Sequence, residues 1–250
     1  MIESLLKKPS VMFKLIYLLA CTAFSASMAC AAPAEKYSII PEPEKTELKR
    51  NATRTLKLLS DKTSPSLSKD SYQLTVTPQG VYLSSGGKEG RIYGLVTLQQ
   101  LQDQLAAHPE GIPCGVIKDK PRYPWRGMMV DPARHFIPIK DLKKFVDLMA
   151  YYKFNKLQLH LTDDQGWRIE IKKYPELTQI GSKRKETVIG HNSGTYDGKE
   201  YGGFYTQDQI RDVINYAAER HITIIPEIDM PGHQLAALAT YPELGCTGGP

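Results

Sequence analysis

Lys156-Leu-Gln-Leu-His-Leu-Thr-Asp-Asp-Gln-Gly-Trp167 is the stretch of this sequence that decides the fold class. Its first six residues, which end at Leu161, indicate a β-strand, and the polar residues from Thr162 onward follow where that strand ends. A strand that delivers carboxylates to its carboxyl end is typical of α/β proteins. The segments on either side show whether other strands do the same.

Both flanks of this strand repeat the pattern. Toward the N-terminus, residues 141–152 have the apolar spacing of an amphipathic helix, and the short apolar run 127–130 before them ends at Asp131. Toward the C-terminus, Thr206 is a helix N-cap candidate ahead of apolar residues at helical spacing, and residues 222–228 then predict a strand that ends at Asp229. The order strand, helix, strand, helix, strand predicts three parallel strands with two crossovers.

This pattern predicts an α/β fold, and it fits both a (β/α)8 barrel and an open α/β sheet. No glycine-rich phosphate loop follows a strand, which disfavours nucleotide-binding folds. Three strands cannot close a barrel of eight. If the fold is a TIM barrel, we expect this chain to hold its first three strands and the remainder to lie beyond Pro250.

A smaller unit precedes these strands. Residues 72–77 and 81–84 alternate and predict a β-hairpin, and residues 91–107 carry apolar side chains at helical spacing. Residues 33–50 are rich in proline and charge and are interpreted as an entry segment, and residues 113–124 as a proline-containing linker. We therefore expect a small α+β domain over residues 33–121 and the barrel part over residues 122–250.

The N-terminal residues 1–32 have the architecture of a signal peptide. Lysines precede an apolar stretch over residues 15–24, and small residues supply cleavage sites between Ala29 and Ala32. The tetrapeptide that ends at Cys21 also resembles a bacterial lipobox, although its apolar run would be only six residues. Soluble export is the favoured interpretation and a lipoprotein the alternative, so we expect a periplasmic or extracellular protein that contacts a membrane only if Cys21 is lipidated.

Composition sets further bounds. The formal net charge is +5 without long basic runs, which argues against a nucleic-acid surface. After the leader no run of eighteen apolar residues follows, so the sequence predicts no transmembrane helix. Only Cys114 and Cys246 remain beyond the leader, and both a disulfide and two unpaired thiols fit the sequence.

Three polar clusters end the three predicted strands, and any one of them could brace loops rather than bind a ligand. Together they would gather carboxylates, imidazoles and a guanidinium on one face, which is the composition of a polar, hydroxyl-binding pocket. The clusters are Asp131-Pro-Ala-Arg134-His135, His160-Leu-Thr-Asp163-Asp164-Gln-Gly-Trp167 and Pro226-Glu227-Ile-Asp229-Met-Pro-Gly-His233.

These motifs resemble the β-N-acetylhexosaminidases of glycoside hydrolase family 20. The resemblance is carried in order by residues 126–136, 156–167 and 226–233, and it extends to residues 90–101 and the junction 121–126. It implies a (β/α)8 barrel that removes terminal β-linked GlcNAc or GalNAc from glycans with retention of configuration. It implies no metal and no cofactor. The segment between Ser38 and Gly90 is short for the family and shows one helix where two are expected, which predicts an incomplete sheet.

The resemblance also implies a substrate-assisted mechanism, in which the 2-acetamido oxygen of the sugar attacks the anomeric carbon to give an oxazolinium intermediate. The family's adjacent Asp-Glu pair, which orients the acetamido group and protonates the leaving oxygen, ends the fourth strand. No such pair occurs in residues 1–250. We therefore expect the acid to lie beyond this segment and the segment alone to be inactive.

Three supporting residues are carried over from the resemblance. Arg134 matches an arginine that donates to ring hydroxyls of the sugar, and the competing role is an ion pair with Asp131. Asp163 and His233 match a relay that orients the catalytic acid, and the competing role is a structural hydrogen bond. We expect His160, Asp164, Glu227 and Asp229 mainly to brace loops. Trp167 is expected to pack rather than to contact sugar, and Trp125 to be buried at the domain junction.

Two other functions fit parts of this sequence. A metal-dependent amidohydrolase could use His160, Asp163 and His233 as ligands, but the sequence lacks a His-x-His pair after the first strand, and Arg134 would place positive charge beside the cation. A non-catalytic glycan-binding protein on a truncated or degenerate barrel is the stronger alternative for this chain. The natural glycan, the preference between GlcNAc and GalNAc, and the oligomeric state are not encoded in recognisable motifs.

Overall fold

The computed structural model describes residues 37–191 and 193–247. The expected signal peptide, with Cys21, lies outside the described residues. None of the helices within the described ranges is both long and apolar enough to cross a bilayer.

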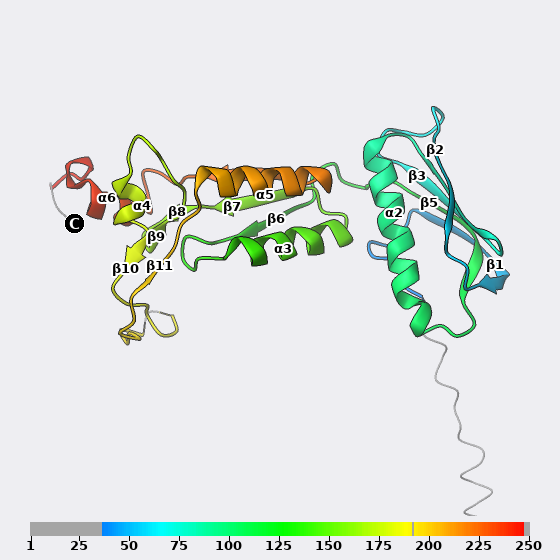
Figure 1. Cartoon of the computed structure of the whole chain (residues 1–250), viewed down its shortest axis with the longest axis horizontal. Coiled ribbons are helices and arrows are strands. Elements are labelled where there is room, and N and C mark those ends of the chain that lie inside the picture. Colours follow the sequence, from blue (N-terminus) through cyan, green and yellow to red (C-terminus); the bar gives the residue numbers. More distant parts are fainter. Residues whose placement is uncertain (1–36, 192, 248–250) are drawn as a thin grey trace, which may run out of the picture. The chain divides into compact units, whose positions relative to one another are not determined.

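The α+β unit is built on a five-stranded sheet with the strand order β1-β5-β3-β4-β2. All neighbouring strands are antiparallel except β2 and β4, which are parallel. The strands are β1 (Lys45–Thr53), β2 (Leu58–Thr63), β3 (Tyr72–Thr77), β4 (Gly80–Ser85) and β5 (Ile112–Asp119). The helix α2 (Lys88–Asp103), followed by the 3-10 turn η1 (Gln104–Ala106), lies along one face of this sheet (Figure 1).

The alternation of buried and half-buried residues along the strands explains the core of the sheet. In β3 the buried residues are Tyr72, Leu74 and Val76, and the residues between them are half-buried, so one face of the strand packs inward. The helix approaches this face closely at Gly94, where a Cβ atom would lie 2.4 Å from a methyl carbon of Leu83. The predicted hairpin and helix are therefore present.

Two predictions for this unit need correction. The linker predicted over residues 113–124 is wrong, because Ile112–Asp119 forms strand β5 in the interior of the sheet between β1 and β3. Pro113 and Gly115 lower the intrinsic strand propensity of the segment, but pairing with two distant strands outweighs it. The sheet also has more strands than the predicted hairpin, and its strand β1 begins within the predicted entry segment over residues 33–50. Within the described residues, α2 is the one α-helix of this unit.

The barrel part begins with a three-stranded parallel sheet of order β12-β7-β6. Its strands β6 (Gly127–Val130), β7 (Lys156–His160) and β12 (Thr223–Glu227) match the three predicted strands within two residues at each end. The helices α3 (Ile139–Tyr151) and α5 (Gln207–Glu219) also match their predictions. Thr206 caps α5, accepting from the backbone of Gln209 while the Gln209 side chain accepts from the backbone of Thr206.

Both helices cover one face of this sheet. Leu157 and Leu159 alternate along β7 and point into a core shared with α3 and α5. The buried members of this core are Leu142, Val146, Met149, Leu157, Leu159, Leu161, Tyr205, Val213, Ala217 and Ile222. Gln158 and His160, which alternate with Leu157 and Leu159 along β7, therefore face the opposite side of the sheet. No helix among the described residues covers that side.

Trp125 lies beside this uncovered face and corrects another prediction. Its side chain was expected to be buried at the junction, but the residue is 63% exposed. Lys156 places its ammonium nitrogen 5.6 Å from the centre of the indole ring, and both residues line a cavity of about 260 Å³ on the sheet. Burial of Trp125 would require further chain on this face.

A long connection between β7 and α5 holds a second small core. It contains the hairpin of β8 (Thr162–Asp163) and β9 (Gly166–Trp167), the helix α4 (Glu176–Gln179) and the pair of β10 (Lys183–Arg184) and β11 (Tyr201–Gly202). After β12 come α6 (Leu235–Thr240) and the 3-10 turn η2 (Pro242–Leu244). Trp167 packs with Leu177, Ala236 and Ala237 and donates from its indole nitrogen to the carbonyl of Ile169 at 2.8 Å, so its packing role is confirmed.

The two remaining cysteines do not form a bridge. Cys114 is free and buried in β5, and Cys246 is free and exposed near the C-terminal end of the described chain. The two unpaired thiols expected as one alternative are what the structure contains.

Candidate active site

The three parallel strands deliver polar side chains to the same end of their sheet. His160 is the last residue of β7 and Glu227 the last residue of β12, and the two positions are register partners. Asp131 follows directly after β6, and its Oδ1 atom accepts a hydrogen bond from the backbone nitrogen of Arg134 at 2.9 Å. This bond turns the chain after β6 and directs Arg134 back over the strand ends.

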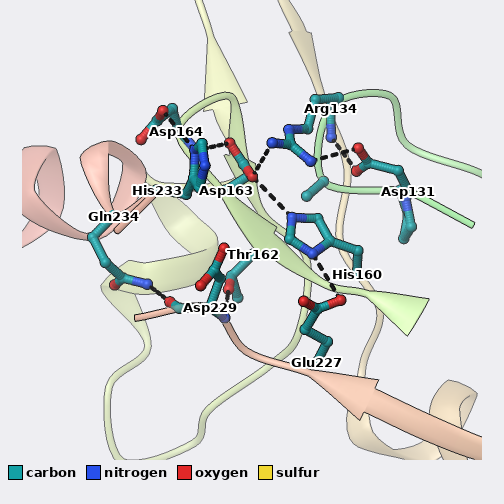
Figure 2. A network of polar contacts seen from close by, with 12 residues as sticks. Asp131, Arg134, His160, Thr162, Asp163, Asp164, Glu227, Asp229, His233 and Gln234 are labelled. Carbon is teal, nitrogen blue, oxygen red and sulfur yellow. Dashed lines mark hydrogen bonds and ion pairs between the residues drawn. The ribbon is translucent and has the colours of Figure 1, made fainter. Parts of the chain in front are cut away.

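Asp163 is the centre of the cluster (Figure 2). Its carboxylate is fully buried, and its Oδ2 atom lies 2.6 Å from Nη2 of Arg134 and 2.8 Å from Nε2 of His160. Its Oδ1 atom accepts from the backbone nitrogen of Asp164 at 2.7 Å and lies 3.3 Å from Nδ1 of His233. Four donors around one buried carboxylate satisfy its oxygens and fix its orientation.

Arg134 bridges two carboxylates. Besides Asp163, its Nη1 atom donates to Oδ2 of Asp131 at 2.8 Å, so the ion pair expected as its competing role is present. Burial acts to lower the pKa of Arg134, but its contacts with Asp131 and Asp163 outweigh burial and raise the pKa. The side chain is still 41% exposed, so a ligand can reach the guanidinium.

His160 sits between two carboxylates. Its Nε2 atom faces Asp163 and its Nδ1 atom lies 3.0 Å from Oε2 of Glu227. Carboxylates only accept hydrogen bonds, so both ring nitrogens can donate at once only in the charged imidazolium form. Burial acts to lower the pKa of His160, but the hydrogen bonds to Asp163 and Glu227 outweigh it and raise the pKa.

Glu227 completes this row of contacts. It also accepts a hydrogen bond from Nε2 of Gln158 at 2.5 Å, and the bonds from Gln158 and His160 lower its pKa. The sequence interpretation missed Gln158, although its position two residues before His160 on the same strand places both side chains on one face. Glu227 and His160 therefore hold each other at the ends of β12 and β7, and a role in bracing loops stays a prediction.

His233 reaches the cluster from the loop after β12. Its backbone has a φ of 54°, and its Nδ1 atom lies 3.3 Å from Asp163 and from Asp164. Its side chain is 51% exposed, and its Nε2 atom has no partner among residues 37–191 and 193–247. One nitrogen thus faces the buried carboxylate of Asp163 and the partly exposed carboxylate of Asp164, while the other can meet a further group. Asp164 braces the same loop, accepting from the backbone nitrogen of Leu235 at 3.1 Å.

Among the described residues, two predicted candidates make no side-chain hydrogen bond or ion pair with the cluster. Asp229 joins the network through its backbone, because its nitrogen donates to the hydroxyl of Thr162 at 3.0 Å and its carbonyl oxygen accepts from Gln234. His135 is exposed and stacks on Tyr201 with ring centres 4.6 Å apart. The structure therefore brings together Arg134, Asp163 and His233 but leaves His135 outside.

Two carboxylate and histidine groups in the described residues have ligand atoms close enough to hold a cation: His160, Asp163 and Asp229, and Asp163, Asp164 and His233. Both groups depend on Asp163, whose two oxygens already accept hydrogen bonds. The guanidinium of Arg134, 2.6 Å from that carboxylate, adds positive charge where a metal would bind. The geometry fits a guanidinium-centred site better than a metal centre.

Comparison with known proteins places both parts of the chain. Residues 123–249 match the model described as glycosyl hydrolase family 20, catalytic domain, and residues 36–120 match that family's domain 2. A beta-hexosaminidase of Akkermansia muciniphila is 60% identical over 86% of this chain and 43% of its own length. A beta-hexosaminidase of Porphyromonas gingivalis is 46% identical over 72% of this chain and 23% of its own length. The chain thus spans less than half of these relatives.

Solved structures of enzymes with related names also match this chain. A crystal structure of a beta-N-acetylhexosaminidase matches with a TM-score of 0.79 and 62% identity over 83% of this chain and 43% of that one. An exo-beta-N-acetylglucosaminidase of Vibrio harveyi in complex with N-acetylglucosamine matches with a TM-score of 0.69 and 33% identity, over 82% of this chain and 38% of that one.

Proposed function

Because this chain belongs to glycosyl hydrolase family 20, we propose that it is the N-terminal part of an exported β-N-acetylhexosaminidase. The enzyme would remove terminal, non-reducing β-linked GlcNAc or GalNAc from glycans with retention of configuration. Its barrel would be completed, and its catalytic acid supplied, by chain beyond Pro250. Export follows from the leader-like residues 1–32, with membrane attachment only if Cys21 is lipidated.

The observation that carries this proposal is the convergence of Arg134, Asp163 and His233 from three strand ends. Arg134 offers a partly exposed planar fork, which suits vicinal hydroxyl groups at the non-reducing end of a sugar. Asp163 fixes that fork from below through a contact of 2.6 Å. Ring hydroxyls would therefore meet a donor whose orientation is set before the substrate arrives.

In this proposal Asp163 and His233 act on the catalytic acid rather than on the sugar. Asp163 holds Nδ1 of His233, and the exposed Nε2 would meet the glutamic acid contributed by the fourth strand. A general acid at neutral pH needs a raised pKa and a fixed direction, and a histidine held by a buried carboxylate can supply the orientation. The sugar's acetamido oxygen would attack the anomeric carbon as the acid protonates the departing oxygen.

The test uses the full-length protein and a chromogenic β-GlcNAc glycoside. We expect the protein to hydrolyse this glycoside. A thiazoline that mimics the bicyclic intermediate should inhibit the hydrolysis, because the acetamido group is the proposed nucleophile. Turnover that a saturating concentration of the thiazoline leaves unchanged would exclude acetamido participation.

One observation favours a second function, a non-catalytic glycan-binding protein. The partly exposed guanidinium of Arg134, fixed by Asp163, could bind a sugar hydroxyl whether or not a catalytic acid is supplied. Sequencing the reading frame past Pro250 separates the two functions. An Asp-Glu pair after a fourth strand supports the hydrolase, and a terminated or degenerate barrel that still binds GlcNAc supports the binding protein.

A further inference from the structure

Arg168, the residue after β9, is a buried cation whose hydrogen-bond partners within the described chain are all backbone carbonyls. The residue is fully buried, and none of its hydrogen bonds there goes to a carboxylate. Burial and the nearby charge of Arg184 lower its pKa to about 10, so the guanidinium is still charged at neutral pH. A buried charge persists only when its donors are satisfied. The positions of these carbonyls show which segments of the chain Arg168 holds together.

Half of the guanidinium is directed at one short turn. The Nε atom donates to the carbonyl oxygen of Pro132 at 3.0 Å and to that of Ala133 at 3.2 Å, and Nη2 donates to Ala133 at 2.9 Å. The other contacts are to the carbonyl oxygens of Ser182 at 2.5 Å, Gly203 at 3.0 Å and Gln165 at 3.4 Å. One planar group thus joins the turn after β6 to three places in the long connection between β7 and α5.

The turn that Arg168 holds is the one that carries Arg134. Pro132 and Ala133 immediately precede Arg134, whose own carbonyl oxygen accepts from Nη1 of Arg184 at 2.9 Å. Three successive carbonyls are therefore fixed by two guanidinium groups from the same connection. Neither Arg168 nor Arg184 belongs to the side-chain cluster around Asp163.

Gly166 shows that this packing is close. A Cβ atom at Gly166 would lie 2.3 Å from Cζ and from Nη2 of Arg168, so a larger residue would displace the guanidinium. Gly166 is also the register partner of Asp163 in the β8–β9 hairpin. The guanidinium of Arg168 is consequently packed between the backbone that presents Asp163 and the backbone that presents Arg134.

We propose that Arg168 is a positioning residue that sets the Arg134 guanidinium relative to the Asp163 carboxylate, and so sets affinity for the terminal sugar. This inference rests on the proposed function, because it requires Arg134 to bind that sugar. Arg168 is buried beneath the turn and acts through Arg134. A guanidinium is needed, because its five N–H groups can donate to carbonyls on several sides at once, whereas a lysine ammonium is one compact group that cannot reach all of them.

Arg54 provides a matched control. Its Nη1 atom also donates to three backbone carbonyls, those of Leu105, His108 and Pro109, but in the α+β unit. A guanidinium that only stabilises the fold should lower the melting temperature when replaced and leave the kinetics of folded molecules unchanged. Arg54→Lys therefore reports what loss of carbonyl contacts does away from the site.

The experiment measures kcat, KM and melting temperature for Arg168→Lys and Arg54→Lys in the full-length enzyme with a chromogenic β-GlcNAc glycoside. Because small displacements of a binding group are costly, we expect Arg168→Lys to raise KM about tenfold, with kcat changed by less than about threefold. Arg54→Lys should leave both constants unchanged. Arg184→Lys, a change of a half-buried side chain, should raise KM in the same direction and covers the case in which Arg168→Lys does not fold.

A double-mutant cycle shows whether the effect passes through Arg134. In an Arg134→Ala background, Arg168→Lys should change kcat/KM by less than about twofold, because the group that it positions is gone. An unchanged KM in folded Arg168→Lys and Arg184→Lys, or an undiminished effect in the Arg134→Ala background, would overturn this inference alone. A parent protein that neither hydrolyses nor binds amino sugars would overturn the proposed function and this inference together.

Discussion

The guanidinium of Arg134 lies 2.6 Å from the carboxylate of Asp163, and that carboxylate is fully buried while the arginine is 41% exposed. Arg134 lies in the turn after β6, and Asp163 lies in the β8–β9 hairpin that follows the neighbouring strand β7. The buried partner fixes the exposed one, so the arginine presents a defined set of donors to solvent. A substitution at either residue should disturb the pair, so each residue can be tested by its own variant.

Asp163→Asn should be strongly damaging to the full-length enzyme. The amide keeps the shape but removes the charge that holds Arg134, His160 and His233. Breaking a buried ion pair costs roughly 3–5 kcal/mol of stability, and we expect kcat to fall at least about a hundredfold through loss of the oriented acid. Urea unfolding and chromogenic kinetics measure the two effects.

The matched control is Asp61→Asn, which removes a surface ion pair of the same 2.6 Å length with Arg91. Surface pairs contribute about 1 kcal/mol or less, so little change is expected. Equal losses in the two variants would contradict the central position of Asp163.

Arg134→Lys should act mainly on substrate binding. Lysine keeps the charge but cannot bridge Asp131 and Asp163 while also donating to two ring hydroxyls. We expect kcat/KM to fall by about 10- to 100-fold, mostly through KM, because hydrogen bonds to charged groups contribute about 1.5–3 kcal/mol each. Arg91→Lys, away from the cluster, should leave KM unchanged, and a normal KM for Arg134→Lys would remove Arg134 from the sugar site.

The pair of His160 and Glu227 predicts how stability depends on pH. The pKa of His160 is raised from 6.5, so its contribution is full below pH 6.5 and is lost as pH rises through the raised value. The pKa of Glu227 is lowered from 4.5, so its contribution is full above pH 4.5 and is lost as pH falls through the lowered value.

The stability difference between wild type and His160→Gln should therefore be largest between pH 4.5 and 6.5. Urea unfolding of the full-length protein at a series of pH values measures it. A difference that grew steadily above pH 6.5 would show that His160 is neutral in the folded protein.

Residues 33–250 expressed alone should be inactive and poorly soluble. The face of the three-stranded sheet away from α3 and α5 exposes apolar side chains such as Met129, which is 53% exposed, and β6 and β12 are edge strands within the described residues. Soluble yield, dye binding to exposed apolar surface and chromogenic assay test this against the full-length protein. Stable, active material from this fragment would contradict both the barrel proposal and the location of the acid.

Local patterns in the sequence were enough to predict the elements that build the site. The strands β6, β7 and β12 and the helices α3 and α5 have clear apolar periods, and Thr206 marks the start of α5 through its capping box. Strand β5 was missed because Pro113 and Gly115 mask its period and its stability comes from pairing with β1 and β3. Trp125 was misplaced because an aromatic residue at a junction does not reveal which face it occupies.

The same division applies to the site. Arg134, Asp163 and His233 were predictable because parallel strands bring their carboxyl ends together. Gln158 could have been found from its spacing to His160. Arg168 could not have been found, because its partners are backbone carbonyls up to 36 residues away. Every residue has a backbone carbonyl, so the sequence does not indicate which ones accept a hydrogen bond.

The most direct test of the central claim is a crystal structure of the full-length protein with a GlcNAc-derived thiazoline bound. We expect the guanidinium of Arg134 within hydrogen-bonding distance of ring hydroxyls of the sugar, with its contact to Asp163 intact and His233 directed at a glutamic acid from the fourth strand. A thiazoline bound elsewhere, or a sugar whose hydroxyls do not approach Arg134, would contradict the account.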